Sequence, residues 1–511
     1  MAKTLRLILG DQLNIKHSWF KELQPDVTYI LLEVMQEQEY VMHHVQKILA
    51  FFGAMRNFAY QLSKLGHKVI YVKLDDENNK QDFAENLNRV IKKEHITRFE
   101  YLLPDEYRLD EQLKEICKSL HIETGSADTE HFLTERMAVK NFFGKKTRYL
   151  MESFYRNMRE KLHVLMDDDE PEGGRWNFDA DNRKKYDGKV PLVPPVVFNH
   201  DVTPLKKMID AANIKYFGEV DAEHFGWPLS RQEALSALKY FCEHLLPNFG
   251  TYEDAMLQQH ISLFHSRMSF AMNVKLVSPF EVVSTVLKYY NKNSKLISLA
   301  QVEGYIRQIV GWREFMRGVY WAQMPDYQEK NFFKHHTEIP HWFWDGKTQM
   351  NCLKHCIGQS LTDAWAHHIQ RLMVIGNFCM LAGINPDDVD AWYLGVYIDA
   401  IQWVEITNTR GMSQYADGGI IGSKPYAASA AYINKMSDYC KNCHYDYKKK
   451  YGERACPYNS LYWNFYERNA EKLQGNPRIG MAYMTLKKMK PDEKQKIMEQ
   501  AELYLDDLNK L

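Results

Sequence analysis

The first third of the chain alternates short apolar runs with longer amphipathic stretches. The apolar runs cover residues 4–10, 27–34, 67–74 and 99–104. The intervening stretches, such as residues 45–66 and 83–95, repeat apolar side chains at helical spacing. Strands that alternate with helices in this way predict a parallel sheet with helices on both faces. We place this α/β domain at residues 1–134.

The pattern becomes irregular over residues 135–229. This region contains DDDEPEGGRWNFDADNRKK at residues 167–185 and VPLVPPVV at residues 190–197. Such polar, Gly- and Pro-containing segments predict an interdomain linker with an exposed loop. From residue 230 the pattern is helical to the end, with clear examples at residues 231–246, 301–321 and 363–383. The sequence therefore predicts a large all-α domain over residues 230–511.

Charge and composition limit the function classes. The chain has 65 Lys and Arg and 66 Asp and Glu, so its formal net charge is −1. A nucleic-acid contact would therefore need a local basic face. No apolar run is long enough for a membrane span. The start MAKTLRLILGDQ has no signal-peptide pattern, and the eight cysteines are irregularly spaced, so we expect a cytoplasmic protein.

Three cysteines near the C-terminus have the spacing of a metal centre. Cys440, Cys443 and Cys456 lie in the run YCKNCHYDYKKKYGERACPYN, and a fourth ligand could come from Cys352 or Cys356 in MNCLKHC. Thiolates in this arrangement suit an iron-sulfur cluster or a structural zinc ion. A set of reduced, buried thiols is a further alternative.

The run HSRMS gathers groups that could bind a diphosphate. It spans His265, Ser266, Met268 and Ser269 at an expected helix start, where hydroxyls and backbone amides favour anions. A simple helix cap is the alternative. Neighbouring candidates are Tyr252, Gln308, Trp312 and Arg313. The first predicted strand ends in a single glycine, Gly10, so a dinucleotide fingerprint of three glycines is absent.

The run AHHIQR carries a candidate general acid. On a helix, His368 and Arg371 share a face, whereas His367 points about 100° away. Histidine has an unperturbed pKa near 6.5, which suits proton transfer, although two core histidines are the alternative. The run lacks the Glu of a zinc-hydrolase site. Further along, Asp399 in the apolar run AWYLGVYIDAIQW needs a buried partner, which a bound polar heterocycle could supply.

The linker contains a DxD pair, Asp179 and Asp181. Two carboxylates at this spacing could bind a divalent cation such as Mg²⁺. A solvated loop is the alternative, and Arg183 and Lys184 could contact phosphate without any metal.

Several of these runs together resemble one known family. HSRMSFAMNVKLVSP, YIRQIVGWREFMRGVYW, DAWAHHIQRLMVIGNF, MSQYADGG and the cysteine set resemble the iron-sulfur bacterial cryptochromes and photolyases, in the prokaryotic (6-4) photolyase branch. The resemblance covers essentially the whole chain. It implies the photolyase/cryptochrome fold, in which a five-stranded, Rossmann-like parallel sheet precedes an all-α FAD-binding domain.

The resemblance implies three cofactors: FAD, a 4Fe-4S cluster and a 6,7-dimethyl-8-ribityllumazine antenna. The positions matching the FAD site are Tyr252, His265, Ser266, Met268, Ser269, Gln308, Trp312, Arg313, Arg371 and Asp399. The antenna would lie near Asp11, Glu33 and Glu37. The cluster ligands would be Cys352, Cys440, Cys443 and Cys456, which leaves Cys356 as a spare thiol.

The implied activity is light-driven repair of pyrimidine-pyrimidone (6-4) lesions in UV-damaged DNA by a monomeric lyase. The excited, reduced flavin would give the lesion an electron and later regain it. His368 would donate a proton, and His367, Tyr426 and Tyr432 would shape the lesion pocket.

Photoreduction of the flavin would use oxidisable aromatic side chains that reach the surface. The resemblance points to Trp344, Trp392 and Tyr393 for this route. Two other functions remain open: a blue-light cryptochrome photoreceptor without repair, and an iron-sulfur nucleic-acid protein similar to the primase large subunit. A photolyase that repairs cyclobutane dimers is an alternative within the same enzyme class, but the two histidines favour the (6-4) lesion as the substrate.

Overall fold

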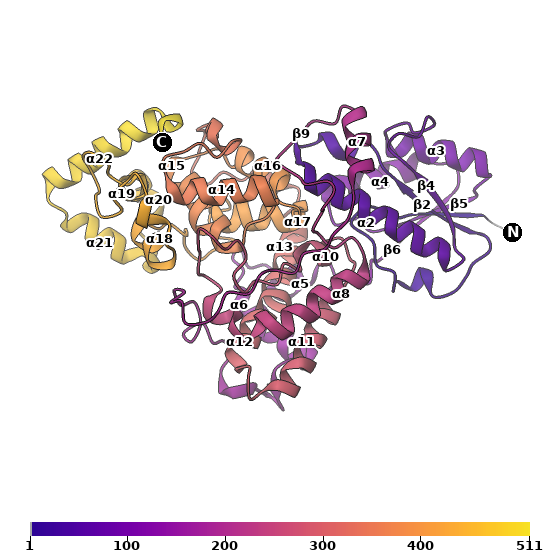
Figure 1. The fold of residues 1–511 in the computed structure, drawn as a ribbon, viewed down its shortest axis with the longest axis horizontal. Coiled ribbons are helices and arrows are strands. Elements are labelled where there is room, and N and C mark those ends of the chain that lie inside the picture. The colour runs from indigo at the N-terminus through magenta and orange to yellow at the C-terminus, as the bar shows by residue number, and fades with distance from the viewer. Residues whose placement is uncertain (1–2) are drawn as a thin grey trace.

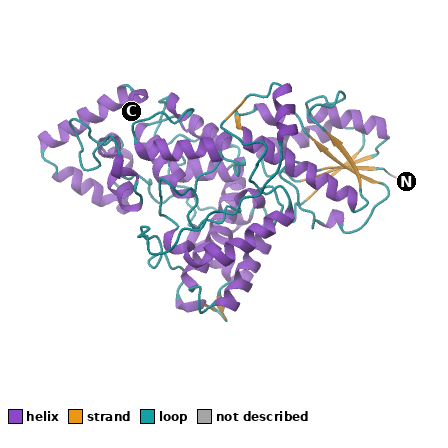
Figure 2. Cartoon of the chain, viewed as in Figure 1, coloured by secondary structure: helices purple, strands orange, loops and turns teal. Residues whose placement is uncertain are grey.

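The computed structural model describes residues 3–511 and begins with a parallel sheet (Figures 1 and 2). Its strands are β1 (Thr4–Leu7), β2 (Val27–Leu32), β4 (Lys68–Val72), β5 (Arg98–Leu102) and β6 (Glu123–Ala127), in the order β4-β2-β1-β5-β6. Leu5 in β1 pairs with Thr28 on one side and Phe99 on the other. All four pairings are parallel, which confirms the predicted sheet.

Four helices accompany this sheet: α1 (Gln36–Glu39), α2 (Val45–Lys64), α3 (Phe83–Glu94) and α4 (Tyr107–Ser119). Leu5, Ile30, Leu87 and Phe99 are fully buried in one cluster, because apolar side chains on the sheet pack against the amphipathic helices. α3 begins where the Asp82 side chain accepts a hydrogen bond from the Glu85 amide, a standard N-cap.

The middle of the chain has few regular elements. They are α5 (Ala138–Phe143), α6 (Met151–Leu162), the hairpin of β7 (Met166–Asp167) and β8 (Glu170–Pro171), α7 (Thr203–Ala211), and β9 (Tyr216–Phe217), which pairs with β3 (His43–His44). Residues 175–202 form neither a helix nor a ladder strand. They run over the helical region as an extended strap (Figure 1).

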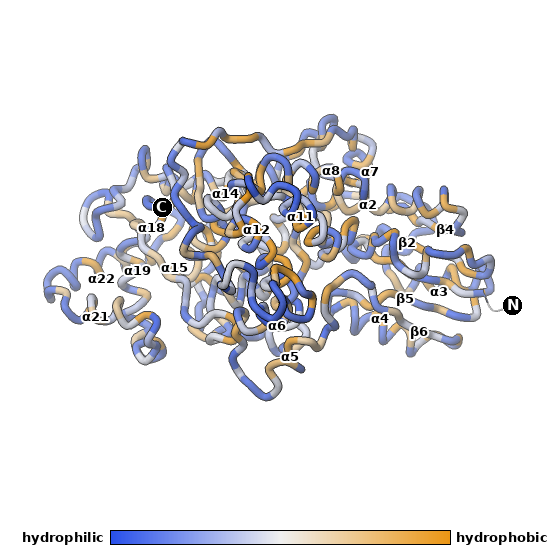
Figure 3. The backbone as a smooth tube through the Cα atoms, turned by 90° about the horizontal axis from the view of Figure 1, so that it is seen from below, coloured by the Kyte–Doolittle hydropathy of each residue, from blue (hydrophilic) through white to orange (hydrophobic). Residues whose placement is uncertain are grey.

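The rest of the chain is helical. Its helices are α8 (Arg231–Tyr240), α9 (Phe249–Tyr252), α10 (Ser269–Asn273), α11 (Pro279–Asn293), α12 (Leu299–Ile306), α13 (Glu314–Gln323), α14 (Asn351–Asp363), α15 (Asn377–Ala382), α16 (Pro386–Val396), α17 (Gln402–Ile406), α18 (Ala430–Met436), α19 (Pro457–Arg468), α20 (Ala470–Leu473), α21 (Gly480–Lys488) and α22 (Pro491–Asp506). Figure 3 shows α22 as a mainly hydrophilic helix at one end of the molecule. No helix among residues 3–511 is long and apolar enough to cross a bilayer.

Buried charges join the sheet to the helical region. Lys275 follows α10 and is 1% exposed, and its Nζ donates to the Asp11 carbonyl at 2.6 Å and to Asp105 Oδ2 at 2.5 Å. Nearer the surface, Glu281 of α11 pairs with Lys16 at 2.7 Å and with Arg231. Removing one member of a buried ion pair leaves the other charge buried without a partner, which is costly. These contacts therefore fix how the sheet packs against the helical region.

Candidate functional site

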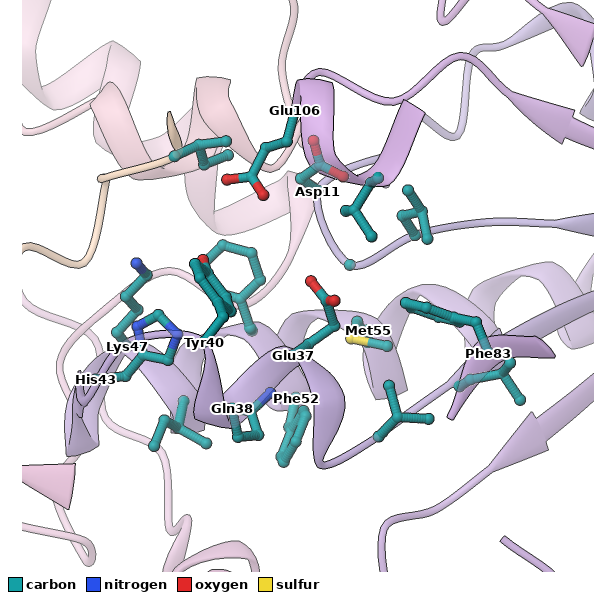
Figure 4. Close-up of a pocket in the computed structure, with 18 of the residues that line it drawn as sticks. Asp11, Glu37, Gln38, Tyr40, His43, Lys47, Phe52, Met55, Phe83 and Glu106 are labelled. Carbon is teal, nitrogen blue, oxygen red and sulfur yellow. The ribbon is translucent and has the colours of Figure 1, made fainter. Parts of the chain in front are cut away.

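One cavity lies where the carboxyl ends of the strands meet the helical region (Figure 4). Three acids contribute to its lining, Asp11, Glu37 and Glu106, together with Lys47. Burial raises the pKa of Asp11 to about 6, although Lys275 opposes the change. Burial also lowers the pKa of Lys47 to about 8. A cavity with several hydrogen-bond acceptors at this edge of a parallel sheet is a typical ligand site.

Two of the three predicted antenna residues line this cavity, and the third does not. Glu37 forms a bidentate pair with Arg108 at 2.8 and 2.9 Å, which presents its carboxylate at the cavity. Glu33 lies outside the lining, because its carboxylate is saturated by Arg56 at 2.7 and 2.8 Å, the Tyr71 hydroxyl at 2.6 Å and the Leu74 amide at 2.9 Å. Glu33 therefore stabilises the α/β domain and does not line the cavity.

Sequence reasoning missed Glu106, Lys47 and Lys275 at this site. Glu106 follows β5 at the carboxyl edge of the sheet, which is a usable signal. Lys47 lies within α2, where its Nζ donates to the Leu394 carbonyl at 2.7 Å. Neither Lys47 nor Lys275 has a local sequence signal, because each finds its partners far away in the chain.

Asp399 has the buried partner that its apolar surroundings require. Arg371 donates from Nη1 at 2.9 Å and from Nη2 at 3.2 Å to the two carboxylate oxygens. Ser269 Oγ donates to Asp399 Oδ2 at 2.5 Å, and Asn273 Nδ2 donates to the Asp399 carbonyl at 2.7 Å. The Arg371 guanidinium also lies 3.7 Å from the centre of the Tyr397 ring. The partner is thus an arginine of the chain itself.

Wide π-helical turns carry several of the predicted cofactor residues. Arg307–Arg313 joins α12 to α13, and Gln370–Gly376 leads into α15. Such turns are frequent at functional sites, because the extra residue redirects the side chains that follow it. The first turn contains Gln308, Trp312 and Arg313, and the second contains Arg371.

Arg313 is buried with unused donors. Its Nη2 contacts Asn273 Oδ1 at 3.3 Å and His131 at 3.1 Å, whereas its Nε and Nη1 have no hydrogen-bond partner within residues 3–511. Burial lowers the pKa of Arg313 to about 10. Asn273 links Arg313 to the Asp399 backbone, so Ser269, Arg313 and Arg371 all belong to the hydrogen-bond network around Asp399.

The HSRMS run forms a loop that leads into α10. The His265 ring stacks on His367 with centroids 4.6 Å apart and planes 14° apart, and its Nε2 lies 3.1 Å from the Glu253 carbonyl. Ser266 Oγ accepts from the Tyr305 hydroxyl at 3.2 Å. Met268 is buried directly before α10. Tyr252, the remaining predicted neighbour, stacks on Phe264 with centroids 5.5 Å apart and donates to Asp187 at 3.1 Å.

The predicted helix over residues 363–383 is interrupted. Ala364 ends α14 in the left-handed conformation with φ of 52°, and the next helical turn begins only at His368. The His367 backbone N–H donates to Gln370 Oε1 at 3.0 Å, a capping contact that fixes the new start. His367 therefore precedes the helix, and the expectation that both histidines lie on one continuous helix is wrong.

The two histidines have different surroundings. His367 is buried, neither of its ring nitrogens has a partner among residues 3–511, and burial followed by His265 lowers its pKa well below the usual value. His368 is exposed to solvent. The surrounding protein, followed by Arg371 and Arg183, lowers the pKa of His368. Buried imidazole nitrogens that lack a hydrogen-bond partner among the described residues are suited to meeting a ligand.

The linker reaches the region around the two histidines. Arg183 donates to Glu253 Oε1 at 2.9 Å. Burial, followed by Asp254, raises the pKa of Tyr432, and burial raises that of Tyr426 while Arg183 opposes the change. Both predicted pocket tyrosines thus lie close to the strap.

The carboxylates of the DxD pair are occupied. Asp179 pairs with Arg307, and with Arg183 at 3.3 Å, while Asp181 pairs with Arg175 at 2.7 Å. Within residues 3–511, no group of three or more His, Cys, Asp or Glu side chains is placed to hold a metal ion. These residues do not fit a Mg²⁺ site, since arginines already neutralise both carboxylates.

The four predicted cluster cysteines line one small, mainly apolar cavity. Cys352 comes from α14, Cys440 and Cys443 from the loop after α18, and Cys456 from the start of α19. Burial raises the pKa of Cys352 and Cys456, and raises that of Cys440 to about 12. Cys356 is outside the lining, and its Sγ lies 3.7 Å from the Tyr439 hydroxyl. Of the two candidates for the fourth ligand, Cys352 lines the cavity and Cys356 does not.

The predicted aromatic residues lie in two places. In α16, Trp392 and Tyr393 contact each other at 5.4 Å, and each contacts Tyr397, at 6.0 and 5.4 Å between centroids. The Tyr393 hydroxyl donates to the Arg371 carbonyl at 2.6 Å. Trp344 is 42% exposed and contacts Phe217 at 5.2 Å. An aromatic series thus extends from Arg371 into α16, and Trp344 lies at the surface.

Comparisons with known proteins agree with this architecture. The family model described as deoxyribodipyrimidine photo-lyase-related protein matches residues 6–225. A (6-4) photolyase of Agrobacterium fabrum (strain C58 / ATCC 33970) is 41% identical over 509 residues, which cover 99% of each chain.

Two solved structures have the same fold at low identity. A bacterial class III photolyase from Agrobacterium tumefaciens has a TM-score of 0.57 at 14% identity, over 96% of this chain and 98% of its own. A Synechocystis sp. PCC6803 cryptochrome has a TM-score of 0.55 at 12% identity, over 96% and 99%. With a relative 41% identical over nearly its full length, the chain belongs to the family of deoxyribodipyrimidine photo-lyase-related proteins.

Proposed function

We propose that this protein repairs pyrimidine-pyrimidone (6-4) lesions in UV-damaged DNA with the energy of blue light. The observation that carries the proposal is the placement of His368 and the unpartnered His367 beside the Arg371–Asp399 pair. The near full-length similarity to a (6-4) photolyase supports the same activity. Return of the transferred oxygen in a (6-4) lesion needs a proton donor, which electron transfer alone does not provide.

The chain has residues that fit FAD. The buried Nε and Nη1 of Arg313 have no hydrogen-bond partner among residues 3–511, although Nη1 lies 3.6 Å from Glu314 Oε1. The Arg371–Asp399 pair adds a polar contact nearby. We assign the diphosphate to the His265–Ser269 loop and the isoalloxazine to Gln308, Arg313, Arg371 and Asp399. When bound and reduced, FAD supplies an electron under blue light.

In this proposal His368 provides the proton. The imidazole is neutral at pH 7 in the free protein, because desolvation by the surrounding protein, followed by Arg371 and Arg183, lowers its pKa. DNA phosphates bring negative charge, which favours the imidazolium form. The flipped lesion would then find its donor beside it, with Tyr426 and Tyr432 enclosing the base and His367 completing the wall.

The cysteine cavity fits a 4Fe-4S cluster. Four thiols from three segments surround one space, which supplies one cysteine for each iron of such a cluster. Such a cluster would cross-link α14 to the C-terminal segments.

The interdomain cavity fits the lumazine antenna. A ribityl chain and a heterocycle offer donors that match Asp11, Glu37 and Glu106. An antenna there would collect light for the flavin. We further assign Trp392, Tyr393 and Trp344 to the route by which electrons from the surface reach an oxidised flavin.

Asp399→Asn is expected to empty the flavin site. The amide cannot balance Arg371 or accept in the same way from Ser269, and stranding a buried charge costs about 3–5 kcal/mol. We expect less than about a tenth of the wild-type flavin absorbance near 450 nm after gel filtration, with iron content unchanged. Asp326→Asn, at an exposed position, is the control. Full flavin content in Asp399→Asn contradicts the assignment.

Glu37→Gln is expected to release the antenna and spare the flavin. The substitution removes the charge that Arg108 orients toward the cavity. Denaturation should then liberate FAD but little lumazine, and repair under direct flavin excitation should persist. Glu39→Gln, on the exposed side of the same helix α1, should retain both chromophores. Equal lumazine release from the two variants would place the antenna elsewhere.

Survival of UV-irradiated, repair-deficient bacteria that express the protein tests the function. The proposal predicts higher survival under blue light than in darkness. A photoreceptor without repair activity would leave the two survival curves identical, although its flavin would still respond to light. An iron-sulfur protein without flavin would give neither result.

A further inference from the structure

The outward face of α21 (Gly480–Lys488) presents two methionines to water. Met481 is 77% exposed and Met484 is 54% exposed, and residues three apart on a helix share a face. The opposite side holds the helix in place, because Leu486 is 5% exposed in the core and the Tyr483 hydroxyl donates to the Tyr466 carbonyl at 3.1 Å. The side chains of Met481 and Met484 therefore lie mainly outside the core.

The same segment is strongly basic. Between Glu471 and Asp492 the chain has no acidic residue and five cations, Lys472, Arg478, Lys487, Lys488 and Lys490, although the whole protein has a net charge of −1. Among residues 3–511, the last four of these cations form no ion pair, in contrast to Lys450 and Lys494 nearby. An unneutralised cationic face is available for a polyanion.

The basic segment lies close to Tyr426 of the proposed lesion pocket. Asn476, at the start of the segment, donates from Nδ2 to the Ser423 carbonyl at 2.9 Å, three residues before Tyr426. Arg478 and Arg183 both act on the Tyr426 phenol by their charge. α21 also lies at the same end of the molecule as α18, which carries Tyr432 (Figures 1 and 3).

We propose that α21 and the turn before it form a docking arm for duplex DNA beside the lesion. Arg478, Lys487 and Lys488 contact phosphates, and Met481 and Met484 pack against the deoxyribose rings. Flexible thioethers adapt to irregular apolar surfaces, and apolar side chains flanked by cations are typical of proteins that distort DNA. The inference rests on the proposed function, because it assigns an additional contact to the same substrate.

The test is dark binding of a labelled duplex with one (6-4) lesion and long flanks, measured by fluorescence anisotropy. For Lys487→Gln/Lys488→Gln we expect a Kd about tenfold higher and a plot of log K against log salt that is shallower by about 1.8, because two phosphate contacts are lost. The light-driven repair rate at saturating DNA should be unchanged. Lys92→Gln/Lys93→Gln, two exposed lysines in the last turn of α3 at the opposite end of the molecule, should match wild type.

The methionines are tested separately. Met481→Ser/Met484→Ser should weaken binding without changing the salt slope, since no charge is altered. If the lysine variant has the same Kd and salt slope as wild type, the docking arm is contradicted, whereas the repair function is not. The arm is also contradicted if the lysine variant binds the lesion duplex normally but binds vesicles containing phosphatidylglycerol more weakly than wild type does. That result would identify a membrane-facing surface. If wild type neither binds the lesion duplex nor repairs it in light, the proposed function fails, and the arm with it.

Discussion

His368→Ala is expected to abolish (6-4) repair while leaving FAD and the iron-sulfur cluster in place. His368 is exposed to solvent near Arg371 and is the first helical residue after the interruption that follows α14. Proton transfer by a positioned side chain contributes about 10²- to 10⁴-fold to a rate. We expect the repair rate per absorbed photon to fall by about that factor, with absorbance near 450 nm and iron content at wild-type values.

The control for this experiment is His336→Ala, an exposed histidine distant in sequence from the HHIQR run. His368→Asn adds a conservative variant that keeps a hydrogen bond but cannot deliver a proton at neutral pH. Wild-type repair by either His368 variant would contradict the role assigned here. Loss of flavin together with repair would instead make His368 a cofactor contact.

Cys456→Ser is expected to have the largest effect on folding. Cys456 lies at the start of α19 and meets Cys352, Cys440 and Cys443 across one cavity. Loss of a thiolate ligand should remove the iron, and metal binding of this kind contributes folding free energy directly. We expect the absorbance near 400 nm to disappear and the protein to become insoluble or lose at least about 10 °C in Tm.

Cys356→Ser provides the matched control, because Cys356 is equally buried, lies one helical turn after Cys352 and is outside the cavity. Its serine can still contact the Tyr439 hydroxyl, so iron should remain at wild-type content. Iron quantified in both proteins decides the assignment. Full iron in Cys456→Ser, or iron lost only in Cys356→Ser, would contradict the ligand set.

The sheet and the helical half could be predicted because both arise from local periodicity. The apolar runs at residues 27–34 and 67–74 became β2 and β4, and Ser230 with Glu233 formed a capping box at the start of α8. Periodicity also led to the error at residues 363–383. Ala364 adopts a left-handed conformation there, and no residue in that run signals a helix end as a glycine would.

Long-range pairing explains what else the sequence did not reveal. The family resemblance placed Glu33 near the antenna, but Arg56 and Tyr71 bind its carboxylate inside the α/β domain. A bound heterocycle was the expected partner of Asp399, whereas Arg371 of the chain itself pairs with it. Spacing alone could not distinguish the DxD pair from a metal site. One of the arginines that pair with its carboxylates, Arg307, lies more than a hundred residues away in the sequence.

The most direct test of repair uses the purified, reduced protein and an oligonucleotide with a single (6-4) thymine pair. Blue light should restore two thymines, detected by chromatography after digestion, while the dark sample and a cyclobutane-dimer substrate stay unchanged. Protein that contains flavin and binds the lesion but restores no thymine under light would contradict the repair function and leave a photoreceptor in its place.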